Sequence, residues 1–555
     1  MNNLRLELMG QSEWHLANIW EAVARTVPDS EAIICGSERL SWQDYENQAA
    51  KLAQVYVDSG LKPGAKVAIY AYNSSEYLVA QFAAFKARLC PININYRYLE
   101  TELAHVINNS DSEAIVFQSE FAPRLDIIRD QLGDVKLFLE INDGSGPHLS
   151  DAKNYASEIA AAEPMPVIER SGDDIYMLYT GGTTGLPKGV MYDQKTISKA
   201  LMTKSMRLRG LPLPDTPKDL IGAIKALASK GLAPRCMPAC PLMHGTGVWV
   251  GVVIPHGLGG AVILFDNHSF DADHILGLIE AEKVQEVVIV GDVFARPIAK
   301  ALDDAVKVGR PYDMSSMKMV NSSGVMFSSE LKTRILNHMD VTIFDSMGST
   351  EGSIGVSVGN RASIATDQTA RFMLAPTSKV MSEDGREIEP GSGEIGMLCN
   401  GSMVPLGYYK DEEKSAKTFR VFNGVRYSVP GDYAILEADG TITLLGRGST
   451  CINSGGEKIF PEEVEEALKT HERIYDCLVV GVPDEKFGQA VTAVFSTVDG
   501  KTIDAADLKS HTRGLLADYK APRHYVNTEL IPRADNGKAN YKAAKAFAQQ
   551  VLGLD

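Results

Sequence analysis

Apolar residues recur along the first half of the chain in short runs that alternate with segments of helical spacing. The runs with the length of a buried strand are residues 67–71, 114–117, 136–141 and 175–179. Between them, residues 41–60 and 75–87 carry apolar side chains three and four positions apart, and Ser41 supplies a capping signal for the first of these helices. This alternation predicts an α/β fold with mostly parallel strands.

The same rhythm resumes further along, and each later strand ends in small or polar residues. The predicted strands are residues 286–291, 319–323 and 341–345. In an open α/β sheet, ligands bind beyond the carboxyl ends of the strands, where small residues leave room for them. The three strand ends therefore predict one ligand cleft.

The longest apolar stretch, residues 248–265, does not predict a membrane helix. It contains four glycines together with Pro255 and His256, which interrupt a spanning helix. Buried strands and turns are the expectation for this stretch, and no integral membrane segment is expected.

After about Arg371 the pattern changes to short strands and turns, and a second domain follows. Residues 432–445 predict a hairpin around Asp439 and Gly440. The glycine-rich run 446–450 is the best linker candidate, and the residues beyond it have β-α content sufficient for a small domain. We expect an N-terminal domain over residues 1–447, a hinge at 448–450 and a C-terminal domain over 451–555.

The charge balance limits the class of ligand. The chain has 555 residues, of which 45% are hydrophobic, and its net charge is −16. This acidity disfavours nucleic-acid binding and a polybasic membrane anchor, so an anionic ligand must be held by local donors. Seven cysteines without paired spacing and a start without a signal peptide predict a cytoplasmic protein.

Residues 179–190 carry the strongest local chemistry. This loop follows a predicted strand and contains four glycines, three threonines and Lys188. Glycines let the backbone approach phosphate oxygens, while hydroxyls and one lysine supply donors. A P-loop is disfavoured because Pro187 precedes Lys188 and no helix can begin there. A plain turn between two strands explains the glycines but not the threonines and the lysine together.

Three further patterns have simpler structural explanations. Cys236, Cys240 and His244 suggest a metal site, but intervening prolines favour a strand that ends in a turn presenting His244. Residues 391–396 match the dinucleotide fingerprint, yet no helix is predicted after them. Lys538 follows an Asn-Gly turn, and from its residue type alone it reads as a surface lysine.

Taken together, five motifs in order resemble the adenylate-forming superfamily of acyl-CoA synthetases, nonribosomal-peptide adenylation domains and firefly luciferase. The motifs are residues 179–190, 241–245, 348–351, 431–447 and 532–538. The resemblance implies a large N-terminal domain of layered α/β sheets with a distorted β-barrel subdomain and a small mobile C-terminal α+β domain. It also implies two half-reactions, in which a carboxylic acid and ATP give acyl-AMP and pyrophosphate, and coenzyme A then gives acyl-CoA and AMP.

The resemblance assigns roles residue by residue. Lys538 bridges the carboxylate and the α-phosphate, His244 lies beside the substrate carboxyl, Thr350 contacts the α-phosphate and Glu351 binds Mg²⁺. The ATP-binding positions are Thr180, Gly181, Gly182, Thr183, Thr184, Gly185 and Lys188 for pyrophosphate, Ser323, Gly324, Asp345, Ser346, Met347 and Gly348 around adenine, and Asp432 with Arg447 at the ribose. The pantetheine arm of coenzyme A is expected to pass Ser454, Gly455 and Gly456.

Some positions depart from the family pattern. Gly182 stands where many members have serine, Met347 replaces the usual tyrosine, and Ser449 and Thr450 occupy the hinge, where aspartate or lysine is common. The first departure removes one phosphate donor, the second concerns adenine stacking and the third concerns domain rotation, and none of them changes the expected reaction.

The acid is expected to be a medium- or long-chain fatty acid or a bulky steroid-type side-chain acid. The chain looks most like bacterial fatty-acyl and steroid side-chain CoA ligases, and small residues near the predicted cleft, such as Gly291 and Ala295, indicate a roomy pocket. The alternatives are an acyl-AMP ligase that loads a carrier protein, a non-catalytic ATP-binding regulatory homologue and a luciferase-like oxygenase. A homodimer is an open alternative to a monomer.

Overall fold

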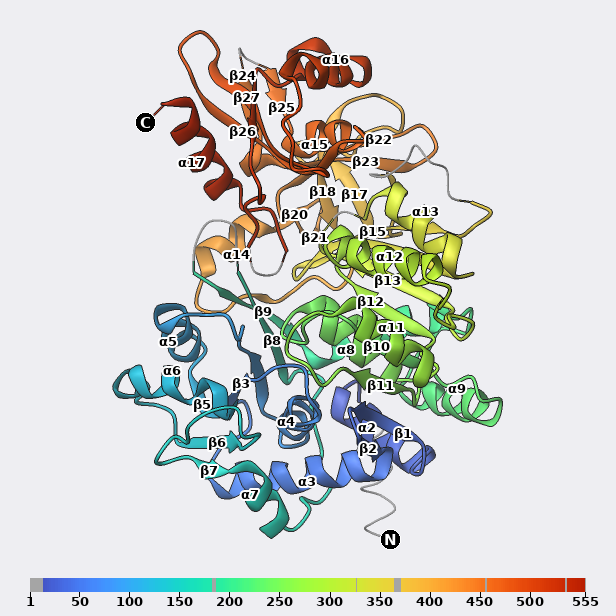
Figure 1. Cartoon of the computed structure of the whole chain (residues 1–555). Coiled ribbons are helices and arrows are strands. Elements are labelled where there is room, and N and C mark those ends of the chain that lie inside the picture. Colours follow the sequence, from blue (N-terminus) through green and yellow to red (C-terminus); the bar gives the residue numbers. More distant parts are fainter. Residues whose placement is uncertain are drawn as a thin grey trace.

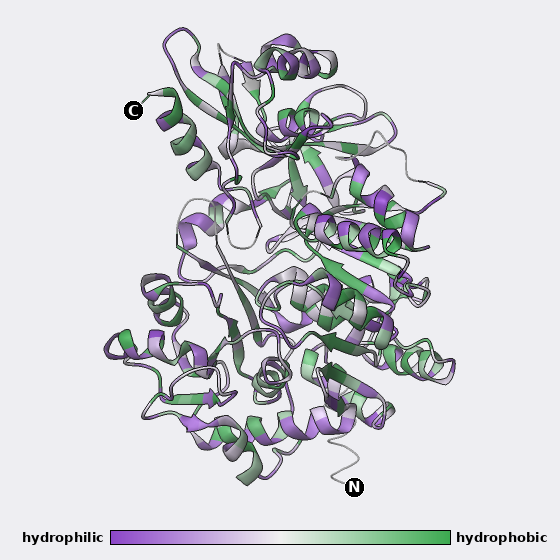
Figure 2. Cartoon of the chain, viewed as in Figure 1, coloured by the Kyte–Doolittle hydropathy of each residue, from purple (hydrophilic) through white to green (hydrophobic). Residues whose placement is uncertain are grey.

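The computed structural model describes residues 13–181, 186–325, 327–363, 371–454, 457–534 and 537–554, except for the side chains of Arg447, Ser449 and Lys458. Figure 1 shows the chain running from the N-terminal sheets at one end to the small C-terminal domain at the other. Hydrophobic residues follow the central strands, while the outer helices carry many hydrophilic ones (Figure 2).

A five-stranded parallel sheet forms the first layer, in the order β4-β3-β5-β6-β7. Its strands are β3 (Lys66–Tyr70), β4 (Cys90–Asn93), β5 (Ser112–Gln118), β6 (Leu137–Ile141) and β7 (Lys153–Asn154). The helices of this region are α2 (Leu16–Thr26), α3 (Trp42–Asp58), α4 (Ser75–Lys86), α5 (Glu100–Asn109), α6 (Ala122–Ile127) and α7 (Tyr155–Ala161). The predicted capping of α3 is confirmed, because the Ser41 hydroxyl accepts from the Asp44 amide at 3.1 Å.

The second sheet is parallel in its central part, which carries the strand ends that were expected to form the cleft. The strands follow the order β2-β1-β11-β10-β12-β13-β14 before turning antiparallel at β15. They are β1 (Glu31–Cys35), β2 (Glu38–Ser41), β10 (Arg235–Pro238), β11 (Ala261–Leu264), β12 (Glu286–Ile289), β13 (Met319–Ser323), β14 (Thr342–Ser349) and β15 (Gly352–Gly359). The helices of this region are α8 (Gln194–Leu208), α9 (Lys218–Ser229), α10 (Ile254–His256), α11 (Ala272–Ala281), α12 (Gly291–Lys307) and α13 (Ser329–His338).

The short strands expected after Arg371 continue this sheet as an antiparallel region. They are β16 (Arg371–Leu374), β17 (Ser378–Met381), β18 (Ile395–Asn400), β20 (Phe419–Phe422), β21 (Val425–Ser428), β22 (Asp432–Leu436) and β23 (Thr441–Arg447). The predicted hairpin is confirmed as β22 and β23, and no helix follows the glycines at 391–396. A separate three-stranded sheet joins β8 (Ile175–Thr180) and β9 (Lys188–Asp193) to β19 (Gly407–Tyr408), which precedes α14 (Glu412–Thr418).

The C-terminal part has its own sheet and its own core. Its strands are β24 (Ile452–Ser454), β25 (Glu457–Ile459), β26 (Ile474–Asp484), β27 (Gly488–Thr497) and β28 (His524–Asn527), and its helices are α15 (Pro461–Lys469), α16 (Ala505–Leu515) and α17 (Tyr541–Leu552). Two apolar clusters formed from residues of this part pack on the sheet.

The apolar stretch 248–265 differs from its prediction. A buried π-helix, Thr246–Val253, runs into α10, and only β11 is a strand. The glycines serve close packing, because a Cβ on Gly247 would lie 2.2 Å from the Pro241 carbonyl oxygen and one on Gly251 would lie 2.6 Å from Pro238. The prediction of buried strands and turns is therefore confirmed for residues 257–264 and wrong for residues 248–256, where glycine allows a tight helix contact and does not form a turn. No helix among the described residues is long and apolar enough to cross a bilayer.

A buried histidine in this stretch gives the N-terminal core a pH dependence. His256 lies against Trp20, Trp42 and Tyr45, and its Nε2 is 2.9 Å from the Ala32 carbonyl oxygen. Its Nδ1 has no hydrogen-bond partner within the described part of the chain. Burial lowers the pKa of His256 to about 4, although the bond to Ala32 acts in the opposite direction. The folded protein therefore binds fewer protons at His256 than the unfolded chain as the pH falls from about 6.5 to about 4.

We predict that this histidine destabilises the fold in acid. Between pH 7 and pH 5, His256 should lower the free energy of unfolding by about 2 kcal/mol. Over this range the histidine of the unfolded chain becomes protonated, whereas the buried His256 of the folded protein stays neutral. His256→Phe should remove that part of the slope in urea unfolding measured at several pH values. An unchanged slope in the variant would contradict the assignment.

Candidate active site

A cleft of about 540 Å³ lies between the large sheet and the C-terminal part, and it gathers most of those predicted site residues that the structure describes. Those that line it are Thr180, Gly181, Gly324, Asp345, Ser346, Met347, Gly348, Thr350, Glu351, Asp432 and Lys538. They come from four of the five motifs and from the strand ends at Gly324 and 345–347, and they span more than 350 positions of the sequence. Convergence of distant polar residues on one concave site is typical of a binding or catalytic centre.

The carboxyl end of β14 and its turn into β15 supply the floor of this cleft. β14 is parallel to β13 as far as Ser346 and antiparallel to β15, so residues 347–351 extend beyond the parallel pairing. The Tyr192 hydroxyl donates to the Thr350 carbonyl oxygen at 2.7 Å, and the Tyr408 hydroxyl donates to Glu351 Oε1 at 2.8 Å. Two tyrosines from other elements therefore fix the positions of Thr350 and Glu351.

Asp345 is held from the opposite face of the strand. Its Oδ2 accepts a hydrogen bond from Lys332 Nζ of α13 at 2.8 Å, and both side chains are nearly inaccessible to solvent. Burial raises the pKa of Asp345, and the charge and hydrogen bond of Lys332 act against that rise. The ion pair fixes this aspartate at the edge of the cleft.

The glycine- and threonine-rich loop within residues 179–190 connects β8 to β9. These strands pair as a hairpin with Thr180 opposite Lys188. The prediction that no helix begins at Lys188 is confirmed. Lys188 Nζ lies 2.5 Å from Asp411 Oδ2 and 5.7 Å from the centre of the Tyr408 ring. The predicted donors Gly182, Thr183, Thr184 and Gly185 lie outside the described residues.

Asn93, Asn73 and Tyr77 hold the turn that presents His244. Asn93 Nδ2 donates to the carbonyl oxygens of Tyr179, at 2.9 Å, and Met243, at 2.6 Å, so it ties the end of β8 to this turn. Asn73 accepts from the Leu242 amide at 2.8 Å, and the Tyr77 hydroxyl donates to the Leu242 carbonyl oxygen at 3.3 Å. A strand ending in a turn was expected here, and β10 provides it.

His244 itself is a neutral imidazole. Its pKa is lowered to about 4, first by burial and then by the charges of Lys538 and Arg97. Its Nε2 is buried without a hydrogen-bond partner among the described residues. A buried orphan ring nitrogen close enough to respond to the Lys538 charge is a position where a ligand oxygen can complete the hydrogen bonding.

Other predicted residues lie outside the cleft wall. Lys188, His244 and Ser323 neighbour it without lining it, and Ser454 ends β24 in the C-terminal sheet, apart from the cleft. The side chain of Arg447 and the glycines Gly455 and Gly456 are outside the described residues, although the Arg447 backbone pairs with Asp432. Cys236 and Cys240 lie in an apolar cluster with Val288, and no group of three or more metal-ligating side chains occurs in the described part of the chain.

Sequence reasoning missed four residues that shape the site. Tyr408 contacts Glu351, and Asp411 contacts Lys188. Asn93 connects two of the motifs, and the nearly buried Phe372 lines the cleft beside Met347. Phe372 supplies an aromatic surface close to the position where the family tyrosine is replaced by methionine. None of the four belongs to a motif, so only the fold could place them.

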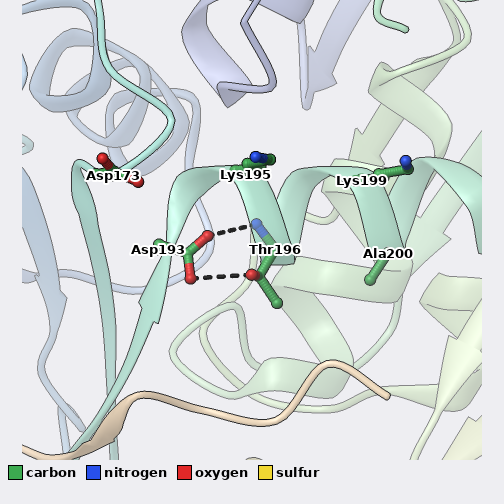
Figure 3. A pocket seen from close by; sticks show the side chains of 6 residues that line it. All are labelled: Asp173, Asp193, Lys195, Thr196, Lys199 and Ala200. Carbon is green, nitrogen blue, oxygen red and sulfur yellow. Dashed lines mark hydrogen bonds between the residues drawn. The ribbon is translucent and has the colours of Figure 1, made fainter. Parts of the chain in front are cut away.

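A second, shallow hollow at the start of α8 carries none of the predicted residues (Figure 3). Asp193 caps the helix there by accepting from the Thr196 amide at 2.7 Å and its hydroxyl at 2.9 Å. Lys195 and Lys199 project from successive turns of the helix beside Asp173 (Figure 3). This hollow is accounted for by helix capping.

Comparison with known proteins places the chain in one group. The family model described as AMP-binding enzyme matches residues 20–409, and that described as AMP-binding enzyme C-terminal domain matches residues 463–538. A 3-oxocholest-4-en-26-oate–CoA ligase of Rhodococcus rhodochrous is 38% identical over 96% of this chain and 95% of its own. The medium-chain acyl-CoA ligase Mig of Mycobacterium avium is 37% identical over 95% of this chain and 97% of its own.

Solved structures agree in fold. An anthranilate CoA ligase in complex with anthranoyl-AMP superposes with a TM-score of 0.84 at 21% identity, covering 98% of each chain. ATP-bound MatB from Rhodopseudomonas palustris superposes with a TM-score of 0.77 at 21% identity, covering 96% of this chain and 99% of its own.

Proposed function

The chain belongs to the AMP-binding enzyme family, and on that premise we propose that it is an ATP-dependent acyl-CoA synthetase, an AMP-forming acid-thiol ligase. The observation that carries the proposal is the shared cleft, where Thr350, Glu351 and Asp432 of the large domain face Lys538 of the small one. A cation from a separate domain beside this polar floor suits a reaction between two anions.

In the first half-reaction a carboxylate oxygen attacks the α-phosphorus of ATP. The new bond joins that oxygen to phosphorus, the bond from the α-phosphorus to its bridging oxygen breaks, and pyrophosphate leaves. In the second, the thiol sulfur of coenzyme A attacks the acyl carbon, the bond from that carbon to the AMP oxygen breaks, and the thiol proton passes to solvent. ATP is spent as AMP and pyrophosphate, and the product is an acyl-CoA thioester.

The residues of the cleft fit the first step. Lys538 offsets the repulsion between carboxylate and α-phosphate, and neutral His244 offers its orphan Nε2 to the substrate side. Thr350 would contact the α-phosphate, and the Glu351 carboxylate, a hard oxygen ligand, would hold Mg²⁺. Mg²⁺, when bound, neutralises charge that develops on the phosphates.

The pyrophosphate site centres on Thr180, Gly181 and Lys188, together with residues 182–185. Lys188 is paired with Asp411, and its ammonium group has two further N–H donors that can bind phosphate oxygens. The Asp345–Lys332 pair, Gly324 and Met347 form the proposed adenine side, with Phe372 as an added apolar wall. Asp432 and Arg447 serve the ribose.

Residues 448–450 are proposed as the hinge between domains 1–447 and 451–555. They form a 3-10 turn directly after β23, and β24 begins at Ile452. Ser454 lies away from the cleft, whereas its proposed role beside the pantetheine arm requires proximity to the acyl group. Rotation of the small domain about this turn accounts for both, since one cleft then serves the two half-reactions in succession.

The proposed acid is a medium- or long-chain fatty acid or a steroid-type side-chain acid. The relatives named above are ligases of such acids. The apolar cluster of Cys236, Cys240 and Val288, on which the partly exposed Val250, Val290 and Phe294 pack, is built on β10 and β12. We propose that the acyl chain binds against its partly exposed members, since apolar contacts select acids by length and bulk.

A coupled assay of AMP release with coenzyme A, over acids from acetate to steroid side-chain acids, tests this assignment. We expect turnover to rise with acyl length, because each buried methylene contributes about 0.8 kcal/mol. Turnover confined to acetate or propionate would contradict the substrate class. Acyl-AMP formation without consumption of free coenzyme A would instead identify a ligase that loads a carrier protein.

A further inference from the structure

One charged group near the cleft has no role in the proposed reaction and yet contacts the loop that carries Lys538. Arg533 Nε donates to Asp476 Oδ2 at 2.7 Å and its Nη2 donates to Asp476 Oδ1 at 2.8 Å, which is a two-pronged pair. Its remaining nitrogen, Nη1, donates to the carbonyl oxygen of Gly537 at 3.0 Å. One guanidinium therefore joins β26 to the residue immediately before Lys538.

Backbone hydrogen bonds close the turn itself, and contacts with other elements set its orientation within the domain. The Ala534 amide donates to the Lys538 carbonyl oxygen at 2.8 Å, and the Gly537 amide donates to the Ala534 carbonyl oxygen at 2.8 Å. Arg533 also pairs with Ala539 across an isolated β-bridge. The guanidinium fork lies across this turn and is rigid because all three of its nitrogens are engaged.

Asp476, the other half of the pair, is held in a fixed direction. It lies where the register between β26 and β27 shifts, and irregularities of this kind re-aim a side chain. Lys469 Nζ of α15 lies 3.5 Å from its Oδ1, and the side chains of Asp476, Arg533 and Lys469 are 19%, 21% and 16% exposed. Burial would raise the pKa of Asp476, but the Arg533 hydrogen bonds and the Lys469 and Arg533 charges keep it below its usual range.

The far side of the turn touches the large domain. Gly537 has φ +79°, and a Cβ built on it would lie 3.0 Å from Val293 of α12, so the turn approaches this helix as closely as glycine allows. Next to Asp476, the ring of Tyr475 lies 4.8 Å from the Arg296 guanidinium of the same helix. The Lys538 turn is thus fixed between the Arg533–Asp476 pair and α12.

We propose that Arg533 and Asp476 are positioning residues for adenylation, which hold the Lys538 turn against α12 so that the lysine reaches the reacting anions. This inference rests on the proposed function. Neither residue touches the substrate in this account. Since a displacement of about 1 Å in a catalytic group costs about a hundredfold in rate, loss of the fork should act mainly on kcat of the first half-reaction.

The test measures the two half-reactions separately in the full-length enzyme carrying Arg533→Gln, Arg533→Lys or Asp476→Asn. We expect acid-dependent ATP–pyrophosphate exchange to fall about 10- to 100-fold in each, with KM for ATP nearly unchanged. Thioester formation from supplied acyl-AMP should stay within about twofold of wild type, because Lys538 acts only in the first step. Lysine cannot form the fork, so Arg533→Lys should not restore exchange.

A control variant and a double variant distinguish a positioning role from a general loss of activity. Arg473→Gln removes another arginine of the small domain, whose Nη2 lies 3.5 Å from Asp499, and should leave both half-reactions unchanged. The double variant Asp476→Asn/Arg533→Gln should be no slower in exchange than the slower single variant, since both substitutions disrupt the same ion pair. Unchanged exchange, or an equal fall in both half-reactions, would overturn the positioning role. A wild type without acid-dependent exchange would overturn the proposed function itself.

Discussion

Replacing Lys538 with alanine should lower acid-dependent ATP–pyrophosphate exchange by about a thousandfold while leaving thioester formation from supplied acyl-AMP largely intact. Removal of one preorganised charge from a reacting oxyanion typically costs about two to three orders of magnitude. Lys538 lines the same cleft as Thr350 and Glu351, and its charge contributes to the lowered pKa of His244. In the proposed reaction Lys538 lies where the carboxylate and the α-phosphate meet, whereas thiol attack on a neutral acyl carbon needs no such charge.

The control for this variant is a lysine of the small domain that does not line the cleft. Lys520 Nζ of the small domain lies 2.5 Å from Glu463, so Lys520→Ala also removes a paired positive charge. We expect it to retain both half-reactions. An equal loss of both half-reactions in Lys538→Ala would contradict the role assigned to this lysine.

Glu351→Gln should lower adenylation by about a hundredfold and weaken the dependence of ATP binding on Mg²⁺. Glutamine keeps the size of the side chain and its contact with the Tyr408 hydroxyl but removes the charge that a hard cation requires. Titration calorimetry of ATP with and without Mg²⁺ measures the binding effect apart from turnover. In the wild type Mg²⁺ should tighten ATP binding, and in the variant this gain should be largely lost.

The chain offers a matched control for this second variant. Glu383 accepts a hydrogen bond from the Tyr433 hydroxyl at 2.6 Å, as Glu351 does from Tyr408, but its side chain is 72% exposed and does not line the cleft. Glu383→Gln should behave as wild type in exchange and in calorimetry. An Mg²⁺ effect that persists unchanged in Glu351→Gln would show that the cation is bound elsewhere.

Much of the α/β layer could be predicted because its signals are local. The runs at 67–71 and 319–323 became β3 and β13 within a residue at each end, and the Ser41 cap placed the start of α3. The carboxyl ends of parallel strands lie at one edge of a sheet, so the sequence alone predicted that the ends of β13 and β14 share a cleft. Asp345 and Gly324 both line it.

The rest depended on contacts between distant elements. Glycine within an apolar run reads as a turn, yet Gly247 and Gly251 let a buried helix approach Pro241 and Pro238. Likewise, nothing in the sequence indicates that Arg533 and Asp476, 57 positions apart, form an ion pair. Their contact exists because β26 and the Lys538 turn lie side by side. Motifs identify residues that touch ligands, whereas the residues that position them are visible only in the fold.

One cleft is proposed to join a carboxylic acid first to AMP and then to coenzyme A. Mass spectrometry of a single-turnover reaction with a long-chain acid, ATP and Mg²⁺ tests this directly, with coenzyme A withheld and then added. We expect acyl-AMP and pyrophosphate in equal amounts first, then conversion of the acyl-AMP to acyl-CoA and AMP. Formation of ADP and phosphate, or ATP cleavage without the acid, would contradict it.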